Sequence, residues 1–236
     1  LVVFGSEMKT LLRSGLVPAE LDPEAVDLYF HYQYVPEPRP PLRAVRKLPA
    51  GHTLTVTLEP WRVEERCYWR MEDAPEIDGD PALVIREELE AVGEIVIRSD
   101  VPVGVALSGG LDSSVIAALA ATRYPGTMHA FSAGYPGRPH SDERADARAL
   151  ATHLGMTFHE VEIETPTVVE AFPRLVGWQD DPIADIAGYA YYSIARAARE
   201  RGIPVLLQGQ GGDELFWGYS WAVDAARQSM RKSRLA

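Results

Sequence analysis

The stretch Val103-Gly-Val-Ala-Leu-Ser-Gly-Gly-Leu-Asp-Ser-Ser114 joins an apolar run, a glycine turn and a helix start. The apolar run from Val103 to Leu107 predicts a short buried strand, and the residues from Ser113 onward predict a helix. Such a turn directs free backbone N–H groups and the positive end of the helix dipole at one spot. The stretch therefore predicts an anion site, and the expected anion is a phosphate.

A second stretch repeats this pattern. The apolar run Val205–Leu207 is followed by the glycine-rich segment Gln208-Gly-Gln-Gly-Gly-Asp213, and a helical pattern comes next. If both strands lie in one parallel sheet, Asp112 and Asp213 emerge at the same edge. A carboxylate beside a phosphate is repulsive unless a divalent cation lies between them, and Mg²⁺ is the ordinary bridge. The two stretches together predict Mg²⁺ and the pyrophosphate part of ATP.

Each of these features has a plainer interpretation. Asp112 could serve as an acidic residue in the first turn of its helix, where a carboxylate complements the helix dipole. The first glycine turn could have been selected for packing, and the pair Gly211-Gly212 alone is typical of an ordinary turn. What favours a binding site is that both stretches place an aspartate after a buried strand and a glycine turn.

Strands and helices alternate from Val101 onward. Strands are predicted at 103–107, 128–133, 158–163 and 203–207, and helices at 113–124, 141–154, 167–178 and 187–201. This alternation predicts an α/β fold, a parallel sheet with helices on both faces. The earlier part of the chain predicts a strand at 1–4, a helix from Asp22 to about Tyr34, a hairpin over 52–69 and a helix from Pro81. The acidic segment 71–79 marks a boundary, so the expected domains are 1–72 and 78–236.

Composition excludes several classes of function. The net charge is −11, which disfavours a general role in binding nucleic acid or a membrane surface. No run approaches 18 apolar residues and the start carries no basic leader, so neither a membrane span nor a signal peptide is predicted. Cys67 is the only cysteine, so no intrachain disulfide can form. A cytoplasmic location is expected.

Lysine is nearly absent: the chain has Lys9, Lys47 and Lys232. No lysine lies between the last two of these, which excludes a Walker A lysine and a Schiff-base lysine there. Any cation that offsets phosphate charge in this part of the chain must therefore be arginine or a metal.

Other polar stretches are less specific. Ala130-Phe-Ser-Ala-Gly134 resembles a degenerate nucleophile elbow, but no helix pattern follows it, so a wall of the nucleotide pocket is the favoured interpretation. Asp180-Asp181-Pro-Ile-Ala-Asp185 predicts either a substrate or metal loop or a solvated loop in which Asp185 caps a helix. The histidines lack metal-ligand spacing, and His129 and His159 at strand ends are expected to be structural. Cys67 has no base nearby in the sequence and is not expected to be a catalytic thiol.

The motifs resemble those of the asparagine synthetase family. Leu107-Ser-Gly-Gly-Leu-Asp-Ser-Ser114 is similar to its PP-loop, and Gln208–Tyr219 to its second ATP-site loop. Phe4–Leu12 and Arg46–His52 resemble the closing part of its class II glutaminase domain. The resemblance implies that residues 1–72 are the end of a class II glutamine amidotransferase domain. It also implies that residues 78–236 are an ATP-binding synthetase domain of the PP-loop type, truncated at its C-terminal end.

In this family a substrate carboxylate attacks the α-phosphate of ATP, and ammonia from glutamine then displaces AMP from the acyl-adenylate. The resemblance implies the following roles: Ser108, Gly109, Gly110 and Ser113 bind pyrophosphate; Asp112 and Asp213 bind Mg²⁺ and are catalytic together with Gln210; Leu107, Ala133, Gln208 and Gly209 line the adenosine pocket. The implied partners are small molecules, namely ATP, a carboxylate, and ammonia from glutamine. A homodimer is compatible with the family, and neither nucleic acid nor a membrane is expected.

Three departures from the family pattern bear on the reaction. The N-terminal cysteine nucleophile of the glutaminase is not in this sequence, so this chain is not expected to hydrolyse glutamine. The family's catalytic lysine in a later helical region is also not in it. Gln210 stands where asparagine synthetases usually have an acid, which favours an acceptor other than aspartate, such as a sugar acid or a natural-product carboxylate. The alternatives are another PP-loop ATP pyrophosphatase, acting in tRNA modification or like NAD synthetase, and a nucleotide-binding module without activity.

Overall fold

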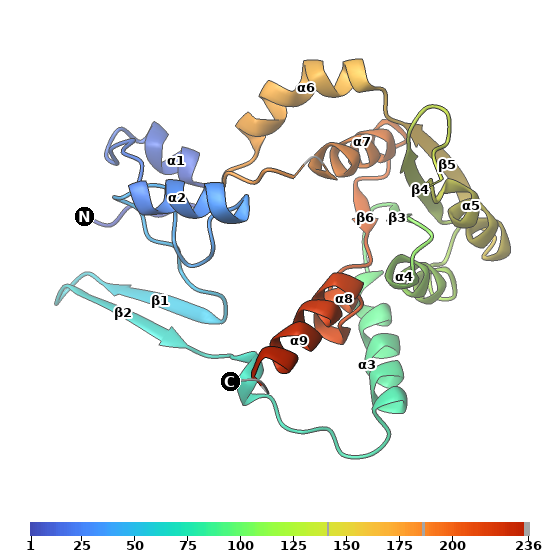
Figure 1. Cartoon of the computed structure of the whole chain (residues 1–236), viewed down its shortest axis with the longest axis horizontal. Coiled ribbons are helices and arrows are strands. Elements are labelled where there is room, and N and C mark those ends of the chain that lie inside the picture. Colours follow the sequence, from blue (N-terminus) through green and yellow to red (C-terminus); the bar gives the residue numbers. More distant parts are fainter. Residues whose placement is uncertain (141, 186, 234–236) are drawn as a thin grey trace. The chain divides into compact units, whose positions relative to one another are not determined.

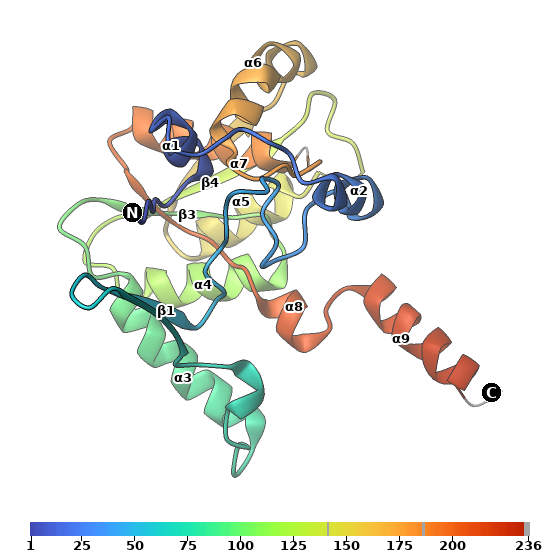
Figure 2. The ribbon, with the colours of Figure 1, turned by 90° about the vertical axis from the view of Figure 1, so that its left-hand side faces the viewer.

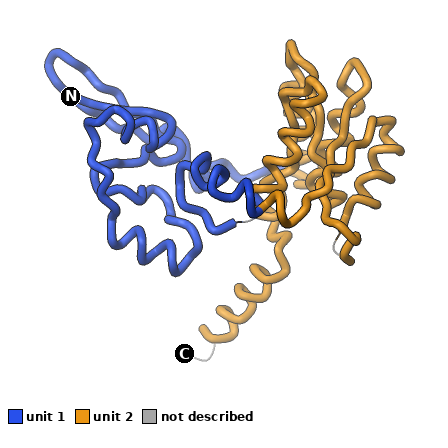
Figure 3. The backbone as a smooth tube through the Cα atoms, turned by 90° about the horizontal axis from the view of Figure 1, so that it is seen from above, with its two compact units in different colours: residues 1–78, 169–188 blue, residues 79–168, 189–236 orange. Residues whose placement is uncertain are grey.

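The structure is a computed structural model that describes residues 1–140, 142–185 and 187–233. The chain forms two compact units (Figure 3). The first unit contains residues 1–78 and 169–188, and the second contains residues 79–168 and 189–236. The return of 169–188 to the first unit has no signal in the sequence. The domain boundaries expected from the sequence, 1–72 and 78–236, therefore stay a prediction.

The second unit is built on a four-stranded sheet (Figure 1). Its strands are all parallel and lie in the order β5-β4-β3-β6. Their bounds are β3 Val103–Ala106, β4 His129–Gly134, β5 Thr157–Glu162 and β6 Val205–Leu207. The predicted α/β class is confirmed. Because β6 pairs directly with β3, the two glycine-rich segments leave the sheet from neighbouring strands at the same edge.

Helices cover both faces of this sheet. α4 Leu111–Ala121 and α5 Arg144–His153 pack on one face, and α7 Ala187–Glu200 packs on the other. The second unit also contains α3 Pro81–Val96, α8 Gly212–Phe216 and α9 Ser220–Ser233. Neighbouring residues of a strand point to opposite faces. Accordingly, Ala130 packs in a core with residues of α4 and α5, whereas Phe131 packs with Ile194 and Ala198 of α7. Helix α3 lies beside α4 (Figure 2), and α9 has no buried residue.

The first unit holds α1 Met8–Arg13, α2 Pro23–Tyr32, the hairpin strands β1 His52–Thr57 and β2 Arg62–Cys67, the 3₁₀ turn η1 Met71–Asp73 and most of α6 Thr165–Trp178. Asp22 begins α2 as its sequence predicts, since its carboxylate accepts a hydrogen bond from the Glu24 N–H at 3.2 Å. The predicted strand at 1–4 is wrong. Those residues pair with no strand of the described chain, and Leu1 and Phe4 are 95% and 87% exposed.

Within the parts of the chain that the structure describes, no helix combines the length and the apolar character needed to cross a membrane.

Two histidines form a stacked pair inside the second unit. His129 of β4 and His159 of β5 lie on the face covered by α7, with 2.8 Å between His129 Nδ1 and His159 Nε2. The Phe131 ring stacks on His159 with 4.8 Å between ring centroids. Burial lowers the pKa of His159, and the positive charge of Arg201 and the neighbouring His129 lower it further. The two stacked rings pack with Phe131 in the core beneath α7.

This depressed pKa predicts how stability depends on pH. Because the pKa of His159 is lower in the folded than in the unfolded chain, the unfolded chain takes up more protons below about pH 6.5. The free energy of unfolding should therefore fall as the pH is lowered from 7.5 to 5.5. Urea titrations across this range should show a flatter dependence for His159→Gln, whereas the exposed control His153→Gln should keep the wild-type slope. Equal slopes for all three proteins would contradict the prediction.

Candidate functional site

The first glycine turn is held by its own serines. Ser108 Oγ lies 2.9 Å from Ser113 Oγ, and the Ser108 N–H donates to Ser113 Oγ at 3.2 Å. The Ser114 hydroxyl donates to the Gly110 carbonyl at 2.7 Å. These bonds close the turn onto the first residues of α4, whose leading N–H groups have no acceptor within the helix. Hydrogen bonds of its own side chains thus fix the shape of the turn.

Gly109 has two features that only glycine satisfies. Its φ is +93°, in the left-handed region that side chains disfavour. A Cβ at this position would also lie 3.2 Å from the Glu143 carbonyl oxygen and 3.3 Å from the Ala147 nitrogen. The start of α5 therefore supports the turn from behind.

The second glycine-rich segment packs directly on the first. A Cβ on Gly209 would lie 2.3 Å from the Ser113 nitrogen and 2.4 Å from the Asp112 carbonyl carbon. A Cβ on Gly212 would lie 2.3 Å from Asp112 Oδ1. The backbone after β6 therefore contacts the first turn of α4, with the Asp112 carboxylate resting on Gly212. This is the convergence that the repeated sequence pattern predicts.

The Asp213 carboxylate also lies against a glycine, in this case Gly218. Its carbonyl oxygen accepts a hydrogen bond from the Gly218 N–H at 3.0 Å, and a Cβ on Gly218 would lie 1.8 Å from Asp213 Oδ1. Each of the two candidate carboxylates thus rests against a bare backbone. The sequence analysis did not single out Gly218, although it is the single glycine after Asp213 in the sequence.

Glu214 and Tyr219 were also not singled out. The Tyr219 hydroxyl donates to Glu214 Oε1 at 2.6 Å, and the Gly211 N–H donates to Glu214 Oε2 at 3.0 Å. The bond to Glu214 raises the pKa of Tyr219 to about 12, with partial burial and the charges of Glu214, Asp213 and Asp112 acting in the same direction. The same bond lowers the pKa of Glu214. The proton of this pair therefore stays on Tyr219 at any physiological pH.

The donor set fits a magnesium ion only together with a nucleotide. Among the residues that the structure describes, no group of three or more His, Cys, Asp and Glu side chains is arranged to hold a metal. Asp112 and Asp213 offer carboxylate oxygens at the start of α4 and of α8. One or two carboxylates plus phosphate oxygens and water is the usual Mg²⁺ arrangement in nucleotide enzymes.

The other candidate residues differ in how far their side chains are exposed. Leu107 is 1% exposed and packs in the core, so any contact it makes with a nucleotide would come from its main chain. Ala133 is half-buried near the end of β4. Gln208 is exposed and lines a cavity of about 110 Å³ between α3 and α4. Gln210 is exposed as well, with 3.4 Å between its Nε2 and Gln208 Oε1.

A buried arginine that the sequence analysis did not identify anchors the start of α5. Arg144 is 1% exposed, and its guanidinium donates to Asp142 Oδ2 at 2.6 Å and to the Tyr135 carbonyl at 2.8 Å. The bond to Arg144 lowers the pKa of Asp142 to about 2 despite burial. A Cβ on Gly134 would lie 2.0 Å from Arg144 Nε, so this side chain occupies the space that glycine leaves at the end of β4.

The aspartates of the segment 180–185 make structural contacts in the first unit. Asp180 accepts hydrogen bonds from the backbone of Met8 and Lys9 at the start of α1. Asp181 Oδ2 pairs with Lys47 Nζ at 2.5 Å, and Asp185 Oδ1 accepts from the Ala187 N–H at 2.8 Å, where α7 begins. Of the two interpretations of this segment, these contacts favour the capping one.

The degenerate elbow does not hold a nucleophile. Ser132 lies inside β4 and is 2% exposed, so its hydroxyl cannot meet a substrate.

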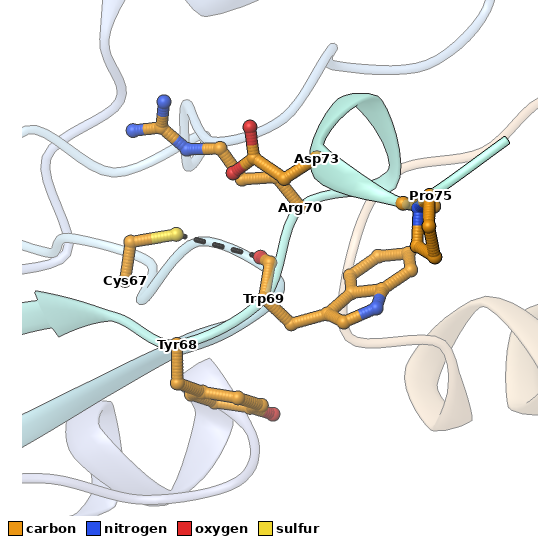
Figure 4. A pocket seen from close by; sticks show the side chains of 7 residues that line it. Cys67, Tyr68, Trp69, Arg70, Asp73 and Pro75 are labelled. Atoms are coloured by element: carbon orange, nitrogen blue, oxygen red, sulfur yellow. Dashed lines mark hydrogen bonds between the residues drawn. The ribbon is translucent and has the colours of Figure 1, made fainter.

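Cys67 lies in an open pocket of about 530 Å³ at the end of β2 (Figure 4). Its thiol donates weakly to the Trp69 carbonyl, with 3.4 Å between the two atoms. The pocket is lined by residues 67–70 and 73–75, which are neighbours in sequence and include none of the candidate site residues.

A parallel sheet whose neighbouring strands end in two glycine turns, each followed by an aspartate, defines the class of PP-loop α/β proteins. The family described as asparagine synthase matches residues 85–236, and the glutamine amidotransferase domain family matches residues 1–69. The chain belongs to the asparagine synthase family.

Individual relatives agree with this membership. The chain is 32% identical to the glutamine-hydrolysing asparagine synthetase 1 of Bacillus subtilis over 222 residues, which cover 93% of this chain and 34% of that protein. It is 32% identical to asparagine synthetase B of Escherichia coli, covering 76% of this chain and 35% of that protein. It is 29% identical to the amidase chyE of Penicillium rubens, covering 92% and 34%. The chain thus spans about a third of the length of these relatives.

Among solved structures, the NH₃-dependent NAD synthetase of Campylobacter jejuni has a TM-score of 0.42 and 18% identity, covering 60% of this chain and 62% of that chain.

Proposed function

We propose that this chain carries the ATP-binding part of an amide-forming ligase. In the proposed reaction a carboxylate oxygen attacks the α-phosphorus of ATP, the bond to the β-phosphate breaks, and pyrophosphate leaves. Ammonia derived from glutamine then attacks the acyl carbon and displaces AMP. The observation that carries the proposal is the packing of Gly209 and Gly212 on the first turn of α4, which brings the two glycine turns into one site.

The residues have separate roles in this proposal. Ser108, Gly109, Gly110 and Ser113 bind pyrophosphate in the first glycine turn. Leu107, Ala133, Gln208 and Gly209 border the adenosine, and Gln210 faces the acyl group. Backbone donors that are already oriented stabilise the charge that develops on the leaving pyrophosphate, an effect typically worth several kcal/mol of barrier.

Asp112 and Asp213 would hold Mg²⁺ against the phosphates. The ion would neutralise phosphate charge and thereby make pyrophosphate a better leaving group. The protein's part is to fix both carboxylates, which the glycine contacts at Gly212 and Gly218 do.

The carboxylate substrate is aspartate or a related acid. Several relatives are described as asparagine synthetases, but one is described as an amidase. Gln210, in place of the acid usual in asparagine synthetases, favours a sugar acid or a natural-product carboxylate as the second candidate. Pyrophosphate release that depends on one added carboxylate would identify the substrate and exclude a module without activity.

The magnesium assignment has a direct binding test. ATP affinity is measured by calorimetry in MgCl₂ and in EDTA for the wild type, Asp112→Asn and Asp213→Asn. In the wild type, MgCl₂ should increase the ATP affinity relative to EDTA. We expect this increase to be at least about tenfold smaller in each variant, which corresponds to about 1.4 kcal/mol. The exposed Asp100→Asn, in the same unit, is the matched control. Unchanged magnesium dependence in both site variants would refute the assignment.

The remaining parts of the proposal concern the whole protein. Residues 1–72 are proposed as the end of a glutamine amidotransferase domain and residues 78–236 as the synthetase domain. A cytoplasmic location is proposed because the reaction consumes ATP and glutamine and because the chain has a single cysteine. A homodimer is compatible with this proposal, and light scattering would establish the oligomeric state.

A further inference from the structure

Helix α8 is too short to hold its own shape. It spans the five residues Gly212–Phe216, and isolated helices of this length are unstable because nucleation is costly. Asp213, one of the two proposed magnesium ligands, is its second residue. Mg²⁺ requires its oxygen ligands at nearly fixed positions in an octahedral arrangement. The helix must therefore be fixed by contacts other than its internal hydrogen bonds.

One carboxylate connects the two ends of this helix. Glu214 Oε2 accepts from the Gly211 N–H before the helix, and Glu214 Oε1 accepts from the Tyr219 hydroxyl after it. Both partners donate to this carboxylate. A glutamine could keep both contacts, because its NH₂ group can donate to the tyrosine oxygen, whereas an alanine at position 214 removes both.

The segment closed by this bridge includes the glycine that contacts the Asp213 carboxylate. Gly218, whose backbone lies against the Asp213 carboxylate, directly precedes Tyr219. Gly211, the other end of the bridge, precedes Gly212, on which the Asp112 carboxylate rests. The bridge between Gly211 and Tyr219 thus spans both Gly212 and Gly218, the glycines that contact the two carboxylates. The stacking of Tyr219 on Trp221, with 5.6 Å between ring centroids, further fixes the tyrosine ring.

We propose that Glu214 and Tyr219 are positioning residues that hold the Asp112 and Asp213 carboxylates in register for one Mg²⁺. This inference rests on the proposed function, since it assigns a role in the same site. The two side chains contact neither the metal nor ATP in this proposal. They act through Gly211, Gly212 and Gly218.

The test measures the ratio of the ATP dissociation constant in EDTA to that in MgCl₂. We expect this ratio to fall about fivefold in Tyr219→Phe and in Glu214→Ala, while the dissociation constant in EDTA stays within about twofold of the wild type, because metal geometry is tuned by supporting hydrogen bonds. The double variant should lose little more than either single variant, since both remove the same bridge. Tyr191→Phe, an exposed tyrosine on α7, is the matched control.

The outcomes separate this inference from the proposed function. If the ATP dissociation constant of the wild type is the same in EDTA and in MgCl₂, both the proposed function and this inference are overturned. A wild-type protein with strong magnesium dependence and a Tyr219→Phe variant with the same ratio overturns the positioning role alone. A variant that loses affinity equally in EDTA and in MgCl₂ shows a merely structural contact and also overturns the inference. Circular dichroism melting of each variant confirms that the fold is retained.

Discussion

Replacing Gly209 with alanine is expected to weaken ATP binding by about 100-fold, because misplacing a binding group by about 1 Å can have an effect of that size. The added Cβ would lie 2.3 Å from the Ser113 nitrogen, 2.4 Å from the Asp112 carbonyl carbon and 2.7 Å from its oxygen. These are main-chain atoms of α4, so no side-chain rotation can relieve the collision. The two glycine turns must separate, and the site that they form together is lost.

Calorimetric titration with ATP and MgCl₂ measures this effect. Gly126→Ala is the control, since its Cβ would make only an ordinary contact of 3.7 Å with the Tyr124 ring. Melting curves should show that the sheet of Gly209→Ala remains folded, because Gly209 lies after β6 and not within it. Wild-type affinity in Gly209→Ala would mean that nucleotide binding does not depend on the close approach of the two turns.

Replacing Arg144 with methionine is expected to lower the free energy of unfolding by about 3 kcal/mol, as removal of one partner from a buried ion pair does. Methionine keeps the apolar stem but leaves Asp142 without its partner. The side chains of Arg144 and Asp142 are 1% and 3% exposed, so water cannot replace the lost bonds. The variant should also weaken ATP binding, because the start of α5 supports Gly109 from behind.

Urea unfolding with Arg138→Met as the control tests this prediction. Arg138 pairs with Glu160 at 2.9 Å but is 57% exposed, and pairs of that kind contribute about 1 kcal/mol or less. The difference between wild type and Arg144→Met should also depend on pH. Because the folded-state pKa of Asp142 is lowered to about 2, its contribution is present above about pH 3.8 and is lost as the pH falls toward 2. Equal stability of the two proteins at pH 7 would contradict the prediction.

The glycine turn proposed to bind phosphate could be predicted from sequence because all of its parts are contiguous. The strand from Val103, the turn at Gly109 and the helix start predicted at Ser113 are formed by local preferences that the structure retains with shifts of one or two residues. The α/β class followed from the same kind of information, since alternation of strand and helix patterns is typical of a parallel sheet. The strand proposed at 1–4 was wrong because a strand exists only through pairing, and an apolar run alone does not supply a partner.

The details of the site depend on contacts between distant segments, which no local pattern contains. Asp112 and Asp213 are about a hundred positions apart in the sequence, and only the pairing of β3 with β6 brings their turns together. The contact of Asp180 with the backbone of Met8 and Lys9 at the start of α1 likewise joins segments that are far apart in the sequence. The bridge from Glu214 to Tyr219 is local in sequence but depends on the left-handed Gly211 and on the fold of α8.

The sequence by itself therefore determined which residues could bind phosphate and metal, because residue type and neighbours set that chemistry. The tertiary structure alone decided that the stretch Val103–Ser114 shares its edge of the sheet with Gly209 and Gly212, and that glycine backbones support both carboxylates. The physical reason is that close approach depends on the absence of a Cβ at one position and on the backbone of another segment. Such a contact is visible only when both segments are placed in space.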